Sequence, residues 1–296
     1  MATNIEISSE DALAKKGGST RVFRTIICIV LCIISIFPFY MMAVNSTLAN
    51  GQVLTAKYFL PKGHFAENIK GLQVWCENAQ IISIWKAMFN SLIVTIPTTF
   101  LQVYFAAFTA YGITVYNFKL KKLAWAFIYA IMMIPTQVSI VGFIKICNLT
   151  HLYGTYIPLI IPAMAAPTTV YFMKQYMEAG FSVEIVEAAR IDGSGELNTF
   201  NKIAVPLIMP AMATQAIFAF VGSWNNLYTP SLILATKKKE LGTLPLYIEA
   251  IKSNDKQRDW GQIYVALFIA VMPILVAYLL LSRYIVAGVA LGGVKE

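Results

Sequence analysis

Residues 187–206 read "EAARIDGSGELNTFNKIAVP", a polar, glycine-interrupted stretch that lies between two long apolar segments. The chain around it is 58% hydrophobic and only 13% charged, whereas an average soluble domain has roughly 25% charged residues. This composition indicates a membrane protein. The polar stretch is therefore a connection outside the hydrocarbon layer. Its mixture of acidic, small and apolar residues indicates more than a simple loop.

Apolar segments of membrane-spanning length occur six times along the chain, and none contains Asp or Glu. Each is close to or longer than the ~20 residues that a helix needs to cross the hydrocarbon layer. The sequence therefore predicts an all-α polytopic membrane protein with six transmembrane helices. We expect a cytoplasmic N-terminal segment (1–24), one membrane domain (25–284) and a cytoplasmic tail (285–296). The six segments are 25–44, 87–112, 123–144, 152–173, 207–235 and 261–282.

Basic residues set the expected orientation. Lys15, Lys16, Arg21 and Arg24 precede the first segment, so the positive-inside rule places the N-terminus in the cytoplasm. Alternation then places residues 174–206 and the C-terminus inside, although the loop 236–260, expected outside, is itself rich in lysine. The basic residues are scattered over loops without an aromatic-interleaved basic module, which argues against a nucleic-acid partner.

The polar stretch predicts a helix, a turn and a second helix at the cytoplasmic surface. We expect Ser182 to cap the first helix, Gly193 to end it with a positive φ, and Ser194 to cap the second. Leu197, Phe200 and Ile203 recur at a spacing of three and predict one apolar stripe. Such a pair can dock in a groove of another protein or rest on lipid; the acidic first helix favours a protein.

The spacing of this stretch resembles the cytoplasmic signature of the membrane permease subunits of ABC-type importers. Glu187-Ala188-Ala189, then Gly193, Ile203 and Pro206 stand at the spacing of that family, with Val205 where Leu is usual. Nearly the whole chain is similar to the six-span partner of the maltose-type carbohydrate permeases. The matching segments are "SWNNLYTPSLIL" (223–234), "TLPLYI" (243–248), "WG" (260–261) and "RYIVAGVALGGVKE" (283–296), with Ser282 in place of a usual Gln.

The resemblance implies the type I importer permease fold and makes residues 182–204 the coupling helices, which seat in a cleft of a cytoplasmic ATPase subunit. Glu187 would face a basic residue of that ATPase; the alternative is an i,i+3 pair with Arg190. The implied coupling residues are Glu184, Glu187, Ala188, Ala189, Asp192, Gly193, Phe200, Ile203 and Pro206.

The chain is not expected to be an enzyme. Gly288 and Gly293 are spaced as in a phosphate-binding loop, but Val294 stands where that loop requires Lys. ATP and Mg²⁺ are therefore expected on the partner ATPase, with no cofactor or metal in this chain. The resemblance gives the tail residues Gly292, Gly293 and Lys295 a contact with the ATPase; the alternative is a solvated terminus.

Polar side chains within the apolar segments are the candidates for a substrate pathway. Amides and a Trp face suit sugar hydroxyls and C–H faces, whereas the alternative is hydrogen bonding between helices. The cluster 224–226 is the strongest candidate. The predicted pathway residues are Gln137, Gln215, Trp224, Asn225 and Asn226, and Asn90 and Gln102 have the same character.

The resemblance implies several partners: a second permease subunit, favouring a heterodimer, a cytoplasmic ATPase dimer, and an extracytoplasmic binding protein that meets loops 45–85 and 236–260. The cargo would be a carbohydrate, expected to be an oligosaccharide, and the location the bacterial cytoplasmic membrane with both termini inside. A stand-alone secondary transporter or channel, or a scaffold without transport, is the alternative. The carboxylate-free spans and the lack of an internal repeat argue against the secondary transporter.

Overall fold

The computed structural model describes residues 3–55, 57–234, 239–253 and 259–292, with the side chains of 3–20, 136–137, 239 and 285–292 left undescribed. The described residues form helices and connections, without a strand. Two compact units divide the chain. The first comprises the residues up to Gly71 together with Asp259–Phe268, and the second comprises the rest; helices α3 (Phe65–Asn78) and α14 (Trp260–Gly292) contribute residues to both.

In the first unit, the end of α1 (Thr3–Ser46) is fixed by a buried amide. Asn68 on α3 donates from Nδ2 to the carbonyl oxygens of Ser46 and Leu48, at 3.0 and 2.9 Å. These carbonyls have lost their helical partners at the end of α1, so the amide satisfies them. Helix α2 (Asn50–Leu54) follows at once, and the Oδ1 of its Asn50 accepts the backbone N–H of Trp260, at 3.0 Å.

Helix α1 exposes an apolar surface over residues 21–40. Residues 21–40 are exposed, and they include isoleucines, leucines, valines and phenylalanines at every face of the helix. A helix that is apolar on all sides is stable in lipid or against another protein. Residues Arg21–Ser46 are accordingly long and apolar enough to span a membrane.

The second unit is built around α4 (Ile84–Val115), which packs against both α8 (Pro167–Gly180) and α11 (Val205–Trp224). Ala106, Ala107 and Ala110 are fully buried, and these small side chains allow neighbouring helices to approach α4 closely. Between the helices, Gln102 donates to the hydroxyl of Thr169, at 2.9 Å. This bond confirms the interhelical alternative for Gln102.

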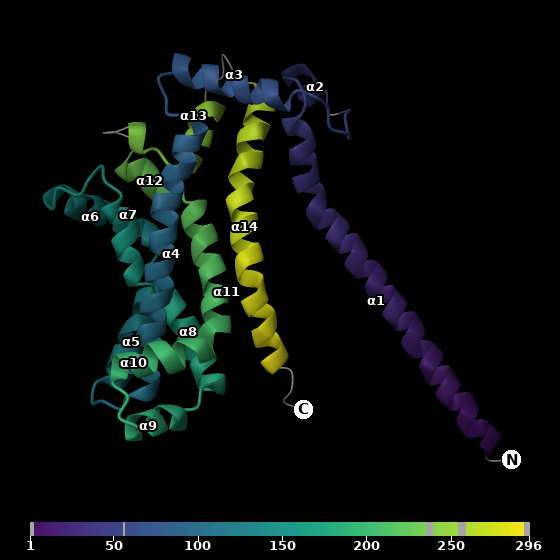
Figure 1. Cartoon of the computed structure of the whole chain (residues 1–296), viewed down its shortest axis with the longest axis vertical. Helices are drawn as coiled ribbons and strands as arrows, with labels where there is room; N and C mark the ends of the chain where they lie inside the picture. Colours follow the sequence, from purple (N-terminus) through teal and green to yellow (C-terminus); the bar gives the residue numbers. More distant parts are fainter. Residues whose placement is uncertain (1–2, 56, 235–238, 254–258, 293–296) are drawn as a thin grey trace. The chain divides into compact units, whose positions relative to one another are not determined.

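Helix α13 (Leu244–Lys252) is attached to the beginning of α4 (Figure 1). Asn90 donates to the carbonyl oxygens of Glu240 and Gly242, both at 2.9 Å, and Ser91 Oγ accepts the backbone N–H of Leu244, at 2.8 Å. Asn90 therefore also bonds within the protein. The connection formed by α9 (Glu184–Ile191) and α10 (Glu196–Thr199) lies at the opposite end of α4 (Figure 1).

Among the described residues, five helical segments, rather than six, are long and apolar enough to cross a membrane. The predicted third segment, 123–144, is divided into α5 (Lys121–Met132) and α6 (Thr136–Leu149), so the six-span count is not confirmed. Pro135 explains the division, because proline lacks the N–H and disfavours helical geometry at the residue before it.

The predicted fourth and fifth segments are also interrupted. The fourth consists of α7 (Ile157–Ile160), a 3₁₀ turn η1 (Ile161–Met164) and α8. The fifth ends as α11 at Trp224, and α12 (Tyr228–Ile233) follows after a short break. The short 3₁₀ helix η3 (Lys239–Leu241) precedes α13.

Candidate functional site

Helix α9 (Glu184–Ile191) begins the polar connection and is amphipathic. Val186 and Ala189 are buried, whereas Glu184, Glu187 and Ala188 are exposed. Ser182 does not cap the helix as predicted: Val183 is the N-cap, and the Ser182 hydroxyl donates to the Glu184 carboxylate instead. This hydrogen bond lowers the pKa of Glu184. The serine lies one residue too early to reach the orphan backbone N–H groups.

Gly193 ends α9, as the sequence predicted. Its φ is +78°, and it is followed by the paired bonds of a Schellman motif. The N–H of Gly193 bonds to the carbonyl of Arg190 at 3.0 Å, and the N–H of Ser194 bonds to the carbonyl of Ala189 at 2.9 Å. A Cβ at Gly193 would meet no atom within 4 Å. The requirement for glycine is therefore conformational rather than steric.

The N-cap of the second helix, α10 (Glu196–Thr199), is Gly195 rather than a serine. The Ser194 hydroxyl accepts hydrogen bonds from the Thr199 hydroxyl, at 2.9 Å, and from the Asn198 amide, at 3.0 Å. The predicted cap at Ser194 is thus wrong, because the side chain binds two other side chains. These bonds still hold the turn at Gly193 and Ser194 against the first turn of α10.

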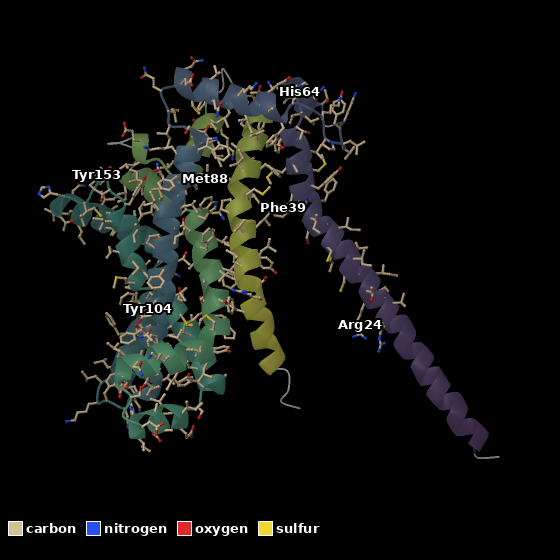
Figure 2. The ribbon with its side chains drawn as sticks, viewed as in Figure 1. Arg24, Phe39, His64, Met88, Tyr104 and Tyr153 are labelled. Carbon is tan, nitrogen blue, oxygen red and sulfur yellow. The ribbon has the colours of Figure 1, made fainter. Side chains whose placement is uncertain are left out.

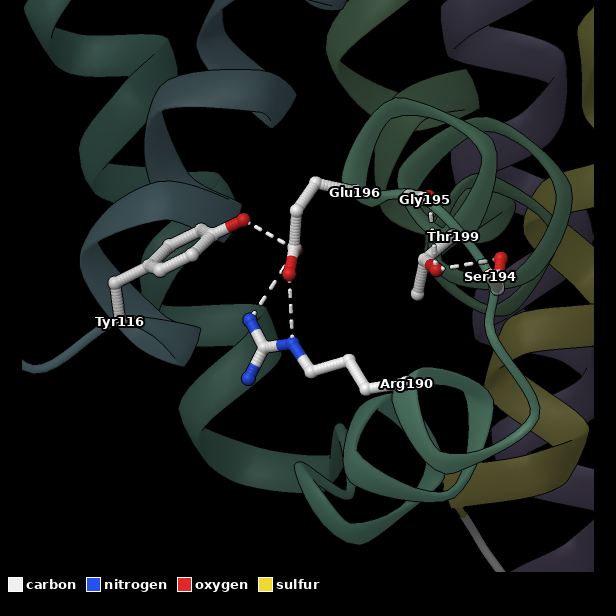
Figure 3. A network of polar contacts seen from close by, with 6 residues as sticks. All are labelled: Tyr116, Arg190, Ser194, Gly195, Glu196 and Thr199. Carbon is white, nitrogen blue, oxygen red and sulfur yellow. Dashed lines mark hydrogen bonds and ion pairs between the residues drawn. The ribbon is translucent and has the colours of Figure 1, made fainter.

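A charged network joins α9, α10 and the end of α4 (Figure 3). Arg190 donates from Nε and from a terminal nitrogen to the two oxygens of Glu196, at 2.8 and 3.2 Å, and the Tyr116 hydroxyl donates to the same carboxylate. The guanidinium also lies over the Tyr116 ring, 5.2 Å from its centroid. Burial and the bond to Glu196 raise the pKa of Tyr116. The network holds the two short helices in one geometry.

Phe200 attaches the connection to the membrane helices. It is fully buried, and its ring centroid lies 5.0, 5.2 and 5.7 Å from those of Phe108, Tyr111 and Tyr104 on α4. Residues Phe200–Ala204 form a π-helical turn, η2, in which the Val205 N–H bonds to the Phe200 carbonyl. Pro206 follows directly and has no N–H to donate, so the regular α-helical bonding pattern is already interrupted at this position.

The predicted stripe of Leu197, Phe200 and Ile203 is not a single face. Leu197 is exposed, Phe200 is buried and Ile203 is half-buried. The π turn changes the angular spacing of the residues within it, so a spacing of three does not hold them on one side. Pro206 is exposed at the beginning of α11.

The outward face of the connection combines acid and apolar groups. Glu184, Glu187 and Asp192 are exposed, together with Ile191, which is 87% exposed. Within the described part of the chain, Glu187 takes part in no ion pair, because Arg190 pairs with Glu196. The predicted alternative of a Glu187–Arg190 pair is therefore wrong. The carboxylate of Glu187 is available to a partner.

The predicted pathway residues are not gathered into one group. Gln215 is buried on α11, and Trp224 is buried, with its indole N–H donating to the Ala270 carbonyl at 3.0 Å. Asn225 is exposed. The Oδ1 of Asn226 accepts the backbone N–H of Thr229 in the first turn of α12, at 3.2 Å, while Leu227 is the N-cap of that helix. Gln137 lies in α6, and its side chain is outside the described residues.

The predicted tail contact falls at the end of α14. Gly292 is the last residue of this helix, while Gly293 and Lys295 lie outside the described residues. Within the second unit, α14 ends toward the same end of α4 as α9 and α10 (Figure 1). The tail therefore begins near the level of the connection.

A model of the "binding-protein-dependent transport system inner membrane component" matches residues 102–291. The chain belongs to this family. It is a membrane-spanning permease subunit, and the predicted resemblance to the importer permeases is confirmed. Members of this family are transport subunits rather than enzymes.

Curated relatives match along most of their length. The arabinooligosaccharides transport system permease protein AraQ of Bacillus subtilis is 27% identical over 93% of this chain and 96% of the relative. AraQ of Halalkalibacterium halodurans is 31% identical over 71% of this chain and 74% of the relative. The sn-glycerol-3-phosphate transport system permease protein UgpE of Pectobacterium atrosepticum is 27% identical over 90% of this chain and 95% of the relative.

A solved structure confirms the fold class. A chain of a bacterial ABC transporter involved in the import of the acidic polysaccharide alginate has a TM-score of 0.72. Its sequence is 18% identical, and the match covers 90% of this chain and 97% of that chain. The all-α importer permease fold predicted from the sequence is therefore correct.

The sequence did not predict the hydrogen bond between Tyr116 and Glu196. They are 80 positions apart and meet only because α4 ends beside α10. Arg190 and Glu196 are six positions apart, and side chains at that spacing do not meet on one helix. They meet here because the chain turns at Gly193. No local signal in the sequence could have found this network.

Proposed function

We propose that this permease forms half of a translocation pathway for a neutral carbohydrate, driven by a separate cytoplasmic ATPase. The α9–α10 connection is the coupling element in this proposal. The observation that carries it is a helix pair locked on its inner side by Phe200 and the Arg190–Glu196–Tyr116 network, with an acidic outer face that forms no ion pair with any described residue.

Rigid attachment is what a coupling element needs. Force applied to α9 passes through buried contacts to α4 and α8, because Val186 and Phe200 belong to the same hydrophobic cluster as Met173 and Tyr111. Close-packed groups transmit displacement because they have little room to deform. The exposed Glu184, Glu187 and Asp192 would meet basic groups of the ATPase.

The orientation follows from charge. Lys119 and Lys122 are exposed at the end of α4 that also carries α9 and α10, in agreement with a cytoplasmic location for this end. Both chain termini are then cytoplasmic, and α13 is outside. The tail with Gly292, Gly293 and Lys295 would reach the ATPase, and ATP and Mg²⁺ would be bound by the ATPase alone.

The charge of α11 and α12, the helices next to the cluster 224–226, supports a neutral cargo. Helices α11 and α12 contain no charged residue, which suits a neutral solute better than a phosphate. Curated relatives are named for arabino-oligosaccharides and for sn-glycerol 3-phosphate, so both are tested. Of the predicted pathway residues, exposed Asn225 and half-buried Asn226 remain the candidates for direct contact, whereas Gln215 and Trp224 are buried and the side chain of Gln137 lies outside the described residues.

The remaining partners are proposed from the family. A second, different permease subunit would complete the pathway, and an extracytoplasmic binding protein would deliver the cargo to the outer loops and α13. A stand-alone transporter is less favoured, because members of the matched family are components of binding-protein-dependent systems. The bacterial cytoplasmic membrane is the matching location.

The test uses the full transporter reconstituted in lipid vesicles with its ATPase, second permease and binding protein. Radiolabelled arabinotriose, maltotriose and sn-glycerol 3-phosphate are offered in turn. We expect ATP-dependent uptake of a neutral sugar and little uptake of the phosphate. Uptake that persists without the ATPase would support the stand-alone transporter, and preferred uptake of sn-glycerol 3-phosphate would contradict the assigned cargo.

Glu187 provides the sharper test of coupling. We expect Glu187→Lys to lower the ATP hydrolysis stimulated by loaded binding protein by about tenfold or more, because a charge reversal against a basic partner costs well over 1 kcal/mol. Lys122→Glu, the reversal of an exposed charge in the first turn of α5, serves as the control and should change hydrolysis by less than about twofold. Equal effects of the two variants would reject the assigned contact.

A further inference from the structure

The connection between α2 and α3 contains a short aromatic and apolar segment with a lysine at each end. Residues 57–62 read "KYFLPK", and we call them the 57–62 loop. Phe59 is 58% exposed and Leu60 is 73% exposed, and Lys57 and Lys62 are exposed on either side of them. Two adjacent large apolar side chains at the tip of a loop are unfavourable in water, so the loop suits an apolar surrounding.

Hydrogen bonds hold this loop against α1. The Tyr40 hydroxyl donates to the carbonyl oxygen of Phe59, at 2.6 Å. Just past the end of α1, the Thr47 hydroxyl accepts the backbone N–H of Lys62 at 2.8 Å, and the Thr47 carbonyl accepts that of His64 at 3.1 Å. Tyr40 lies six residues before the end of α1, so the loop folds back along the helix rather than away from it (Figure 1).

The length of α1 gives the depth of this attachment in a membrane. Arg21 and Arg24 precede a stretch of α1 that contains no charged residue. At about 1.5 Å per residue, Tyr40 lies about 28 Å beyond Arg21 and about 24 Å beyond Arg24 along the helix. The hydrocarbon layer is about 30 Å thick, so the bonded carbonyl is at the far boundary of this layer. Arg24 and Phe39 lie toward the two ends of the stretch in Figure 2.

The bond from Tyr40 also supplies what irregular backbone needs at that depth. A carbonyl group at the edge of the hydrocarbon layer has little water to bind, so it requires a donor from the protein. Tyrosine is common at membrane boundaries, because its ring suits the apolar side and its hydroxyl suits the polar side. Tyr40 is 43% exposed on the apolar surface of α1, so this surface continues onto the loop.

The charge of the loop indicates the polar groups that it meets. The two lysines stand on either side of the apolar residues, and no acidic residue occurs between Asp11 and Glu67. The Lys62 ammonium lies over the ring of Tyr58, 3.8 Å from its centroid. A lysine can lay its stem along apolar groups while its ammonium reaches the phosphate groups of lipids. A protein partner in water would meet the end of α1, whereas the Tyr40 bond holds the loop below that level.

We propose that the 57–62 loop is a membrane anchor that lies in the boundary region of the bilayer. Phe59 and Leu60 lie among the lipid chains, and Lys57 and Lys62 meet the headgroup phosphates. In the proposed orientation this is the outer leaflet. The inference depends on the membrane span of α1 and not on the identity of the cargo. The rest of the outer loop 45–85 stays available to a binding protein.

The first experiment measures the depth of the loop in lipid vesicles that contain the assembled transporter. The four native cysteines are replaced by alanine, and a nitroxide label is attached to Leu60→Cys or to the control Lys70→Cys, an exposed position on α3. Oxygen concentrates in the hydrocarbon layer and a neutral nickel chelate stays in water, so the ratio of their collision rates with the label reports depth. This ratio should be at least about fivefold higher at Leu60→Cys, because boundary segments lie about 5–10 Å below the headgroup surface.

The second experiment tests the two lysines with the label kept at Leu60→Cys. Reversing both charges with Lys57→Glu and Lys62→Glu should lower the oxygen-to-nickel ratio by about threefold or more in vesicles that contain phosphatidylglycerol, because anionic headgroups repel carboxylates. In vesicles of phosphatidylcholine alone, the same variant should change the ratio by less than about 1.5-fold. Lys70→Glu is the matched control and should leave the ratio at Leu60→Cys unchanged in both lipids.

Four results would overturn the inference. Nickel collisions as frequent at Leu60→Cys as at Lys70→Cys would place the loop in water. Protection of the Leu60→Cys label only after the binding protein is added would assign the loop to that protein. A label that meets neither oxygen nor nickel would be covered by protein, as at an interface with a second permease. An equal effect of the charge reversals in the two lipids would exclude anionic headgroups as partners of the lysines.

Discussion

At the scale of single residues, side chains of one type play different parts according to what surrounds them. Asn90 and Gln102 both bond within the protein, whereas Asn225 is exposed. All three stand in apolar segments and could not be told apart by their local sequence. An amide in a membrane helix commonly bonds across helices, so only exposure separates a pathway candidate from an interhelical contact.

Gly193 gives a prediction at this scale. Gly193→Ala should destabilise the α9–α10 turn by about 1 kcal/mol, because a positive φ is sterically unfavourable for alanine, whereas glycine adopts it freely. Hydrogen–deuterium exchange in residues 184–199 should then rise by about fivefold.

Gly195→Ala is the matched control for this variant. Gly195 has a φ of −70°, and a Cβ there would also meet no atom within 4 Å. In Gly195→Ala, the hydrogen–deuterium exchange of residues 184–199 should remain within about twofold of wild type. A similar increase in both variants would mean that loss of glycine flexibility, and not the positive φ, is responsible.

At the scale of elements, breaks and close approaches of helices come from particular residues. Pro135 separates α5 from α6, and the π turn before Pro206 changes the face that Phe200 presents. Both prolines were visible in the sequence, but their effect on helix phase was not. A proline can be accommodated by a kink, a break or a wide turn, and the packing around it decides which one occurs.

Gly261 gives a prediction for the first unit. A Cβ at this position would lie 2.6 Å from the carbonyl oxygen of Leu48 and 2.8 Å from the amide nitrogen of Asn68. Gly261→Ala should therefore separate the beginning of α14 from the end of α1, with a cost of about 1–3 kcal/mol and a fall in Tm of several degrees. Thermal unfolding of the purified permease in detergent measures this change.

Gly51→Ala is the comparison for Gly261. Gly51 lies in α2, and a Cβ there would meet nothing within 4 Å. Alanine should leave Tm unchanged or raise it slightly, because it is the better helix former by about 1 kcal/mol. An unchanged Tm for Gly261→Ala would show that the helices can separate at no cost, contrary to the packing described above.

At the scale of the whole molecule, the connection α9–α10 and helix α13 stand at opposite ends of α4 (Figure 1). A membrane-spanning α4 therefore places them on opposite sides of the bilayer. The position of α13 is set by Asn90 and Ser91, and that of α10 by Tyr116 and Phe200. A single helix thus connects the two proposed partner surfaces.

This arrangement predicts the labelling of single cysteines in intact cells, in a background without the native cysteines. A membrane-impermeant maleimide should label Glu249→Cys on α13 but should label Asp192→Cys only after the membrane is opened. Both native side chains are exposed, so accessibility within the protein is matched. The reverse pattern would place the α9–α10 connection outside and would contradict its proposed contact with a cytoplasmic ATPase.

The sequence by itself determined the class of the protein, the apolar segments and the turn at Gly193. These features depend on local composition, on the length of apolar runs and on a dihedral angle that glycine adopts readily. The spacing of Glu187, Gly193 and Pro206 was also local, and it was sufficient to indicate the family that the comparison with known proteins then confirmed.

Only the tertiary structure decided which of these residues meet. The Tyr116–Glu196 bond and the burial of Phe200 against α4 join positions from about 80 to about 90 residues apart. No periodicity encodes such contacts. They follow from the packing of α4 against α8, α10 and α11, where buried area and satisfied hydrogen bonds are gained only after the chain has folded.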